Sequence, residues 1–415
     1  MTGKTGNIIL PITTTHSKTD WRMPIISPPF FTKEEQDEFT ISYQQHADKI
    51  QDKLEKYGVA IVTNVLDDAD CQSLEDAFCA DCLNVVDIPN SSSKHPTLKQ
   101  LRSNDGLRNN NVDFNEFHNG GGLAYQHGLS MGKFAWKSRL HKNVRSIFET
   151  LYQTEHFSTG LDIPFFTPQT SPLQTQNHEW LHVDQNHNTG LIRNCYQGIL
   201  YVWGSEDNRS SSTIVCPKSH LPEVYNQIME DPYAKGTNQQ FLKLWYLQSD
   251  GTADLHWRAK NEARRLAMPP GSLLLWDSRL IHQGYQSGPR LAMPVCWEPT
   301  EHRPYDSRLR KLWMCAAGFP STHSSVEGRV HDICIKDKKS CGVKLTGRSS
   351  HHLQLRPTLV PWCVKEGMEE KWKDLIEQQL WKHGDNPSWN ADAKKIKPYA
   401  EQIEEILRQD VLDCL

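Results

Sequence analysis

Histidines and carboxylates separated by one residue are the feature of this sequence that could bind a metal ion. The pattern occurs three times, as His46-x-Asp48, His182-x-Asp184 and His383-x-Asp385. A chain of 415 residues with 19 histidines and 50 acidic residues gives roughly two such matches from composition alone. The pattern by itself therefore proves nothing, and the local structure must decide which pair can chelate an ion.

The first and third pairs lie in segments that do not favour chelation. Residues 31–58 ("FTKEEQDEFTISYQQHADKIQDKLEKYG") have a Thr cap, early acidic residues and a closing Gly, which together predict a helix. Side chains two positions apart on a helix point about 200° away from each other, so His46 and Asp48 cannot easily hold one ion. His383 and Asp385 follow a predicted helix in "LWKHGDNPSW", where a Gly and a Pro indicate a turn.

The second pair lies in a region that predicts strands. Between about residues 161 and 297, short apolar runs alternate with turn signals, which is typical of a β-sandwich or barrel. Side chains two positions apart on a strand share a face, so His182 and Asp184 can both point into one barrel mouth. A further histidine with apolar neighbours, His282, follows downstream. The runs are "LDIPFF", "EWLHVDQ", "YQGILYVWG", "SSTIVCPKSH", "ARRLAMP", "SLLLWDS", "RLIHQGY" and "LAMPVCWEP".

The sequence also predicts the elements that precede residues 161–297. Residues 1–30 are rich in Thr, Pro and Ser and predict an extended lead-in. A buried strand is expected at 59–66, followed by helices at 67–83 and 137–152. The stretch 91–122 is rich in Asn and Gly, which predicts a long loop that is either a functional lid or disordered.

The C-terminal part predicts two amphipathic helices, at 366–384 and 397–412. Such helices can cover the barrel, form a dimer or bind a partner, and packing on their own domain is the simplest expectation. One stripe of the first helix carries Trp372, Leu375, Ile376, Gln379 and Leu380.

Composition excludes several classes of protein. A net charge of −4 gives no overall footprint for nucleic acid, although residues 301–360 hold 11 Lys/Arg against 5 Asp/Glu. There is no run of about 18 apolar residues, so a membrane span is not expected. Eleven scattered cysteines without a secretory leader indicate reduced thiols of a cytoplasmic protein. Cys71, Cys79 and Cys82 fall near one helical face, which favours buried packing over zinc binding.

The order of four motifs carries a resemblance to a known family. "LHVDQNH", "STIVCPKSH", "PPGSLLLWDSRLIHQG" and Arg290 resemble the phytanoyl-CoA dioxygenase-like branch of the Fe(II)/2-oxoglutarate oxygenases. "YGVAIVTNVLDDADCQSLEDAF" resembles the opening strand and helix of that family, so the likeness covers about residues 55 to 300. It implies a mainly β core with flanking helices, a double-stranded β-helix of the jelly-roll or cupin type. The oxygenase domain would span 31–300, with its jelly-roll core at about 161–300, and 301–415 would form a basic segment and helical extension.

The resemblance also implies a set of site residues. His182, Asp184 and His282 would bind Fe(II) as a facial triad, which leaves room for 2-oxoglutarate and O2. Arg290 would bind the distal carboxylate of 2-oxoglutarate, because a guanidinium fork suits a carboxylate, with Arg279 as a rival. Trp203 corresponds to an aromatic residue near the co-substrate, although a core position is an equally simple explanation.

Five further residues are expected near the site. Asp277 matches an acidic position of the family and could orient an iron-binding histidine, although capping of the turn is a close alternative. The residues expected to line the substrate pocket are Gln126, His127, Asn186 and His187.

The implied reaction is oxidation of an organic substrate. Halogenating members of the family replace the metal carboxylate with a small residue, whereas Asp184 keeps it, which favours hydroxylation of a C–H bond in a small metabolite with release of succinate and CO2. The alternatives are an oxygenase that acts on a protein side chain or nucleobase, and a non-catalytic metal-binding member. The specific substrate and the oligomeric state are not written in the sequence, because specificity comes from irregular loops.

Overall fold

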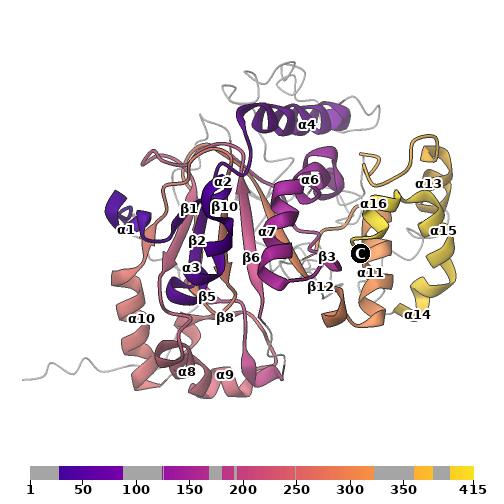
Figure 1. The fold of residues 1–415 in the computed structure, drawn as a ribbon. Coiled ribbons are helices and arrows are strands. Elements are labelled where there is room, and N and C mark those ends of the chain that lie inside the picture. The colour runs from indigo at the N-terminus through magenta and orange to yellow at the C-terminus, as the bar shows by residue number, and fades with distance from the viewer. Residues whose placement is uncertain are drawn as a thin grey trace, which may run out of the picture.

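The computed structural model describes residues 28–86, 124, 126–167, 180–190, 194–247, 249–321, 359–376 and 393–415. Two β-sheets form its centre, with helices on their outer faces (Figure 1). The expected mainly β core with flanking helices is therefore confirmed. No helix in the described part is long and apolar enough to cross a membrane.

The larger sheet has seven strands. Six of them follow the order β1-β2-β10-β6-β12-β3, and β4 also pairs with β12. The pairs are antiparallel except for β1 with β2. The strands are β1 (Thr40–Ser42), β2 (Val59–Thr63), β3 (Phe157–Thr159), β4 (Phe165–Thr167), β6 (Tyr196–Tyr201), β10 (Ser272–Asp277) and β12 (Arg290–Pro299).

The smaller sheet has five strands in the order β8-β5-β11-β7-β9, all antiparallel to their neighbours. Its strands are β5 (His182–Val183), β7 (Ser212–Cys216), β8 (Leu242–Lys243), β9 (Arg264–Arg265) and β11 (Ile281–Tyr285). Each of the eight predicted apolar runs contains a strand or borders one. The short strands β1, β3 and β8 were not predicted, because three or fewer residues leave no periodicity to detect.

Alternate side chains along the strands enter different cores. On β10, Leu274 and Trp276 belong to a cluster that also includes Tyr201 of the larger sheet and Val215 of the smaller sheet. Leu273 and Leu275 belong to a second cluster, formed with the helices on the opposite face. The first cluster therefore lies between the two sheets, and both faces of the larger sheet are buried.

Helices cover the outer faces of both sheets. The outer face of the larger sheet packs on side chains of α3 (Ile50–Tyr57), α4 (Asp68–Val86), α6 (Lys133–Arg139) and α7 (Lys142–Tyr152). The outer face of the smaller sheet packs on α8 (Pro222–Glu230), α9 (Pro232–Gly236) and α10 (Asp250–Glu262). The short helical segments are α1 (Lys33–Asp37), α2 (Tyr43–His46), η2 (Ala47–Lys49), η5 (Gln126–Met131), η6 (His187–Thr189), η7 (Leu244–Tyr246) and η8 (Thr300–His302).

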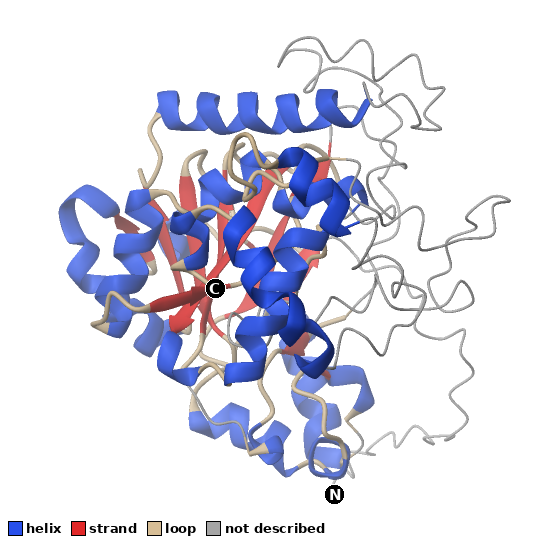
Figure 2. Cartoon of the chain, turned by 90° about the vertical axis from the view of Figure 1, so that its right-hand side faces the viewer, coloured by secondary structure: helices blue, strands red, loops and turns tan. Residues whose placement is uncertain are grey.

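A separate helical layer follows β12, and Figure 2 shows helices in front of the sheets on this side. It consists of α11 (Tyr305–Ala317), α13 (Glu369–Leu375), α14 (Ala393–Ile396), η12 (Lys397–Tyr399), α15 (Ala400–Ile406) and α16 (Gln409–Leu412). Trp372, Leu375 and Ile376 of the predicted stripe are buried in one cluster with α11 and α15. Trp372 Nε1 donates a hydrogen bond to the Ala316 carbonyl at 2.7 Å. These three side chains therefore pack on their own chain.

Some boundaries differ from the sequence expectation. The single helix expected over 31–58 is divided into α1, α2 and α3, because Thr40–Ser42 pairs with β2 as a parallel strand. The helix expected at 397–412 ends at Ile406, where Leu407 forms an isolated bridge with Val364. The three predicted buried cysteines are partly confirmed, since Cys79 and Cys82 are buried and Cys71 is intermediate. The nine cysteines of the described residues are all free thiols.

Several expectations fall outside the described residues. They concern the extended lead-in before residue 28, the whole loop at 91–122, the pair His383-x-Asp385, and residues 377–384 of the helix expected at 366–384. Most of the basic segment between 301 and 360 also lies outside.

Candidate metal centre and co-substrate site

Two histidines face each other across neighbouring strands of the smaller sheet. His182 on β5 and His282 on β11 are direct Cα partners in the antiparallel register. Directly opposed residues of an antiparallel pair place their side chains on the same face. The ring centroids lie 4.2 Å apart, and the two residues are only 2% and 5% exposed. Strand pairing therefore brings together two imidazoles that are 100 positions apart in the sequence.

Asp184 completes the group from the end of β5. Its Oδ1 lies 3.6 Å from His182 Nε2, and its Oδ2 lies 3.3 Å from His282 Nε2. One potential ligand atom from each of the three residues lies within 4.8 Å of the other two. This is the only such group of metal-binding side chains in the described part of the chain. Two imidazoles and one carboxylate form the donor set of the 2-His-1-carboxylate Fe(II) sites.

The backbone fixes the tautomer of both histidines. His182 Nδ1 lies 2.9 Å from the Trp180 carbonyl, and His282 Nδ1 lies 2.9 Å from the Leu280 carbonyl. A carbonyl oxygen can only accept, so Nδ1 carries the proton and donates in both rings. The lone pair of each Nε2 is then directed toward Asp184. Hydrogen bonds of this kind orient metal-binding histidines and increase their basicity.

Aromatic rings hold the histidines in place. Trp180 stacks on His182 with a centroid distance of 4.6 Å and an interplanar angle of 15°, and Phe241 contacts the same ring at 4.5 Å. Trp276 packs on His282 at 5.1 Å. Because these neighbours restrict rotation of both rings, the nitrogen ligands are positioned before any ion arrives.

Arg290 lies at the start of β12 as a buried cation. It is 4% exposed, and its guanidinium stacks 4.2 Å from the centroid of the Phe165 ring. One nitrogen donates to the Tyr201 hydroxyl at 3.2 Å, whereas the buried Nε has no hydrogen-bond partner among the described residues. Burial lowers the pKa of Arg290 below its ordinary value. A buried guanidinium with an unused donor is costly unless it binds an anion, and a carboxylate matches its geometry.

Two residues that the sequence analysis missed connect Arg290 to the metal-binding sheet. The Tyr201 hydroxyl is 2.9 Å from Thr213 Oγ1, and both residues are buried. Val215 is the β7 residue directly opposite His282, and Thr213 lies two positions along the same strand, so it shares the face of His282. A buried Tyr in a core strand gives no signal in the sequence, because its hydroxyl partner is chosen only by sheet packing.

Trp203 is not part of this polar group. Its indole Nε1 donates to Glu75 Oε2 on α4 at 2.9 Å, and its ring packs on Phe166. It belongs to the cluster on the outer face of the larger sheet, whereas Tyr201 belongs to the cluster between the sheets. The structure thus favours the core position that the sequence analysis gave as the equal alternative, because the chain leaves the strand after Tyr201 and turns Trp203 outward.

For Asp277, the described residues show no direct hydrogen bond to either histidine. Its carboxylate binds Arg279, with Oδ1 accepting from Nε at 2.8 Å and from the Arg279 backbone N–H at 2.8 Å. Backbone carbonyls, not Asp277, accept from the iron-site histidines. The turn-capping alternative is the one that the structure contains. Arg279 is thereby paired with Asp277, and the carboxylate raises the pKa of the guanidinium.

The expected pocket residues have different environments. Asn186 is fully buried, and its side chain donates to the carbonyls of Ala234 and Gln239 at 3.0 Å each, so it holds the loop around these residues in place. His187 is partly exposed and packs edge-on against the Tyr225 ring at 4.8 Å. Burial and the nearby Arg279 lower the pKa of His187. Gln126 and His127 lie in η5, and their side chains are outside the described part.

Comparison with known proteins identifies the family. The family model for phytanoyl-CoA dioxygenase matches residues 54–291, which is more than half of the chain. The chain therefore belongs to the phytanoyl-CoA dioxygenase family, as its motifs indicated. The cofactors expected from the sequence, Fe(II) with 2-oxoglutarate and O2 as co-substrates, are those of this family, and the three ligands and the buried Arg290 fit them.

Individual relatives are distant. Ava biosynthesis cluster protein O from Aspergillus versicolor is 21% identical over 210 residues, which cover 49% of this chain and 66% of that protein. The matched region is thus just under two thirds of that relative's length.

Similar solved structures are distant as well. The epimerase SnoN in complex with Fe3+, alpha ketoglutarate and nogalamycin RO shares 10% identity, with a TM-score of 0.37 over 62% of this chain and 85% of that chain. The GlcNAc Inducible Gene 2 protein from Candida albicans shares 12% identity, with a TM-score of 0.42 over 87% and 88% of the two chains. At such TM-scores these likenesses assign neither an activity nor a substrate.

Proposed function

We propose that this protein is an Fe(II)- and 2-oxoglutarate-dependent dioxygenase that hydroxylates an unactivated C–H bond of a small organic metabolite. The observation that carries the proposal is the pairing of His182 with His282 across two strands, with Asp184 3.3 Å from the second imidazole. Membership of the phytanoyl-CoA dioxygenase family supports the same chemistry.

The residues of the chain have separate roles in this reaction. His182, Asp184 and His282 hold Fe(II), which with 2-oxoglutarate and O2 supplies the oxidising power for inserting one oxygen atom into the C–H bond. The other oxygen atom enters succinate, and CO2 is released. Arg290 binds the distal carboxylate of 2-oxoglutarate, supported by its contact with the Tyr201 hydroxyl. The surrounding core excludes water, which strengthens this ion pair.

The same proposal includes the architecture and location of the enzyme. The two sheets with their shared core form a double-stranded β-helix, with the oxygenase domain at 31–300 and a helical extension after it. The free thiols of the described cysteines favour the cytoplasm.

The rim beside His182 favours an organic substrate with apolar surface. Trp180, Phe241 and Trp245 are each partly exposed, and the first two contact the His182 ring. Lys243 is the direct cross-strand partner of His182 on the edge strand β8, and its ammonium lies 4.8 Å from the Trp245 ring. Partly exposed aromatic rings beside a buried metal site are typical of small-molecule pockets. A non-catalytic metal-binding role is less favoured, because it requires no buried cation such as Arg290.

Two measurements test the function. Anaerobic addition of Fe(II) and 2-oxoglutarate to the purified protein should produce the visible charge-transfer band of the ternary complex, and 2-oxoglutarate without metal should not. Succinate release should then be screened against a metabolite library that includes peptides and oligonucleotides. Absence of the band rejects the cofactor assignment, and turnover only with peptides or oligonucleotides replaces the small-metabolite proposal by its macromolecular alternative.

A further inference from the structure

The turn that joins β10 to β11, residues 277–280, contacts two of the three metal-binding residues. The Ser278 carbonyl accepts a hydrogen bond from the Asp184 backbone N–H at 2.9 Å. The Leu280 carbonyl accepts from His282 Nδ1, also at 2.9 Å. One short turn therefore restrains the backbone of the carboxylate ligand and the ring of the second histidine.

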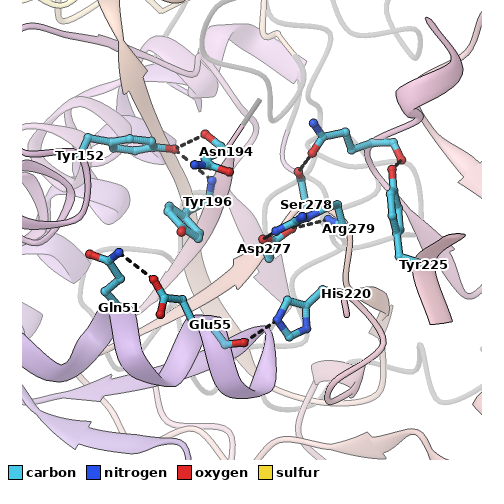
Figure 3. A network of polar contacts seen from close by, with 11 residues as sticks. Gln51, Glu55, Tyr152, Asn194, Tyr196, His220, Tyr225, Asp277, Ser278 and Arg279 are labelled. Atoms are coloured by element: carbon cyan, nitrogen blue, oxygen red, sulfur yellow. Dashed lines mark hydrogen bonds and ion pairs between the residues drawn. The ribbon is translucent and has the colours of Figure 1, made fainter. Parts of the chain in front are cut away.

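The residue that follows Asp184 is held from both sides. Ser278 Oγ donates to Gln185 Oε1 at 2.7 Å, and the Tyr225 hydroxyl donates to the Gln185 carbonyl at 2.7 Å. Figure 3 shows Ser278 near its centre, with Asp277 and Arg279 beside it and Tyr225 to the right. Gln185 and Ser278 are 3% and 2% exposed, so water does not compete for these bonds. The segment that carries Asp184 is thus fixed to the turn.

An ion pair within the turn fixes its own shape. Asp277 accepts from the Arg279 backbone N–H and from its guanidinium through both carboxylate oxygens, at 2.8 Å and 2.5 Å. The carboxylate is buried, whereas the Arg279 side chain is 30% exposed. In the same turn, the backbone N–H of Asp277 donates to the Gly58 carbonyl and that of Ser278 donates to the Cys195 carbonyl, both at 2.9 Å. The turn is therefore bonded to the residues that precede β2 and β6 of the larger sheet, and the ion pair with Arg279 restricts its conformation.

We propose that the Asp277–Arg279 pair is a positioning device for the metal site. It sets the conformation of the turn, and the turn sets the positions of Asp184 and His282. Among the described residues, no hydrogen bond or ion pair joins Arg279 to the three candidate ligands, so its effect on them passes through the turn. The inference rests on the proposed metal site, but it concerns metal affinity and not the reaction. Residues that orient metal ligands in this way typically change affinity by roughly 10- to 100-fold.

Co(II) titration of the metal-free protein under anaerobic conditions tests this role through the visible d–d bands. Arg279→Gln should raise the dissociation constant for Co(II) by about 10- to 100-fold and change the band shape at saturation. Arg279→Lys should recover only part of the affinity, because an ammonium keeps the charge but not the two-pronged contact. Thermal unfolding of the metal-free variants measures separately the cost of leaving the buried Asp277 carboxylate without its partner, and this cost should be smaller in Arg279→Lys, which keeps the charge.

Arg308→Gln is the matched control. Arg308 also forms a half-exposed ion pair, with Glu404 at 2.5 Å, but it lies on α11 in the helical layer. Its loss should leave Co(II) affinity unchanged. Ser278→Ala, which removes only the hydroxyl bond to Gln185, provides a second variant that should also weaken Co(II) binding.

The outcomes separate this inference from the proposed function. Co(II) affinity within twofold of the unaltered protein in both Arg279→Gln and Ser278→Ala overturns the positioning role and leaves the metal site intact. No Co(II) binding by the unaltered protein would remove the metal site itself, and the proposed function with it.

Discussion

Two regions of this molecule contain the same His-x-Asp pattern in different backbone conformations. His182 and Asp184 lie on and just after β5, whereas His46 ends α2 and Asp48 lies within η2. On the strand, the two side chains share a face, and the direct cross-strand partner His282 adds a third ligand. On a helix, side chains two positions apart point about 200° away from each other, so the same pattern does not place two ligands on one face.

The strand and the helical segment differ in whether a neighbouring segment can supply a third candidate ligand. The pair on β5 gains a partner because an antiparallel neighbour places another residue opposite each position of the strand. A helix satisfies its backbone hydrogen bonds internally, so no second segment is brought into register with it. The capacity to chelate an ion therefore follows from strand pairing and not from the sequence pattern alone. Four experiments test this difference.

The largest effect is expected from the ligands themselves. Each of His182→Ala, Asp184→Ala and His282→Ala should abolish turnover and strongly lower Fe(II) affinity, because one of three protein ligands is lost. His46→Ala and His383→Ala should leave both unchanged. Isothermal titration with Fe(II) under anaerobic conditions and succinate assays measure these effects. Equal loss of iron binding in His46→Ala would break the comparison.

Asp184→Gly tests what the strand pair provides besides affinity. Loss of this carboxylate should abolish oxidation without producing efficient chlorination, because Asp184 completes the candidate triad and nothing else in the sequence suggests a halide pocket. Mass spectrometry of products formed with chloride present provides the measurement. A chlorinated product in good yield would mean that the surrounding residues already form a halide pocket.

Arg290→Ala is expected to have a smaller and more selective effect. Charge-assisted hydrogen bonds to the distal carboxylate contribute roughly 1.5–3 kcal/mol each, so the apparent Michaelis constant for 2-oxoglutarate should rise by about one to three orders of magnitude. Arg290→Lys should restore part of this loss, and Fe(II) affinity should barely change.

Arg308→Ala on the helical layer is the control for the Arg290 experiment, and it should leave the constant for 2-oxoglutarate unchanged. The assignment of the co-substrate end would be wrong if Arg279→Ala, assayed at saturating Fe(II), raised that constant while Arg290→Ala did not.

The smallest effect concerns a buried carboxylate that binds a helix and not an ion. Asp81 on α4 accepts from the backbone N–H groups of Lys133 and Phe134 at the start of α6. Burial raises the pKa of Asp81 to about 7. In the unfolded chain an Asp has a pKa of about 3.9, so the folded state holds the proton more tightly, and this contribution to stability disappears as pH rises through about 7.

Asp81→Asn should isolate this contribution. The free energy of unfolding of the unaltered protein, relative to Asp81→Asn, should fall by about 2–3 kcal/mol between pH 5 and pH 8. Urea unfolding at the two pH values provides the measurement. Asp37→Asn, on the exposed helix α1, should show no such trend, and a relative stability that rises with pH would contradict the assigned direction.

Sequence patterns were sufficient to predict the family, most strands of the core and the three candidate ligands. Short apolar runs with turn signals between them predict strands, since strands buried on both faces, such as β10 and β12, are apolar along most of their length. His182 and Asp184 were recognisable because a strand fixes how neighbouring side chains point, and the order of the motifs indicated His282 and Arg290. The fusion of 31–58 into one helix was wrong, because Thr40–Ser42 gains hydrogen bonds from β2 that no local signal reveals.

The residues that surround the candidate ligands and Arg290 could be identified only from the tertiary structure. Trp203 and Tyr201 are two positions apart, but only Tyr201 contacts Arg290. The chain leaves β6 after Tyr201, and Trp203 packs with α4 on the outer face. Asp277 was expected to orient a histidine directly, whereas backbone carbonyls accept the hydrogen bonds from both histidines and Asp277 caps the turn at 277–280. Hydrogen-bond partners that are distant in sequence are selected by sheet register and packing, and a single sequence contains no record of that register.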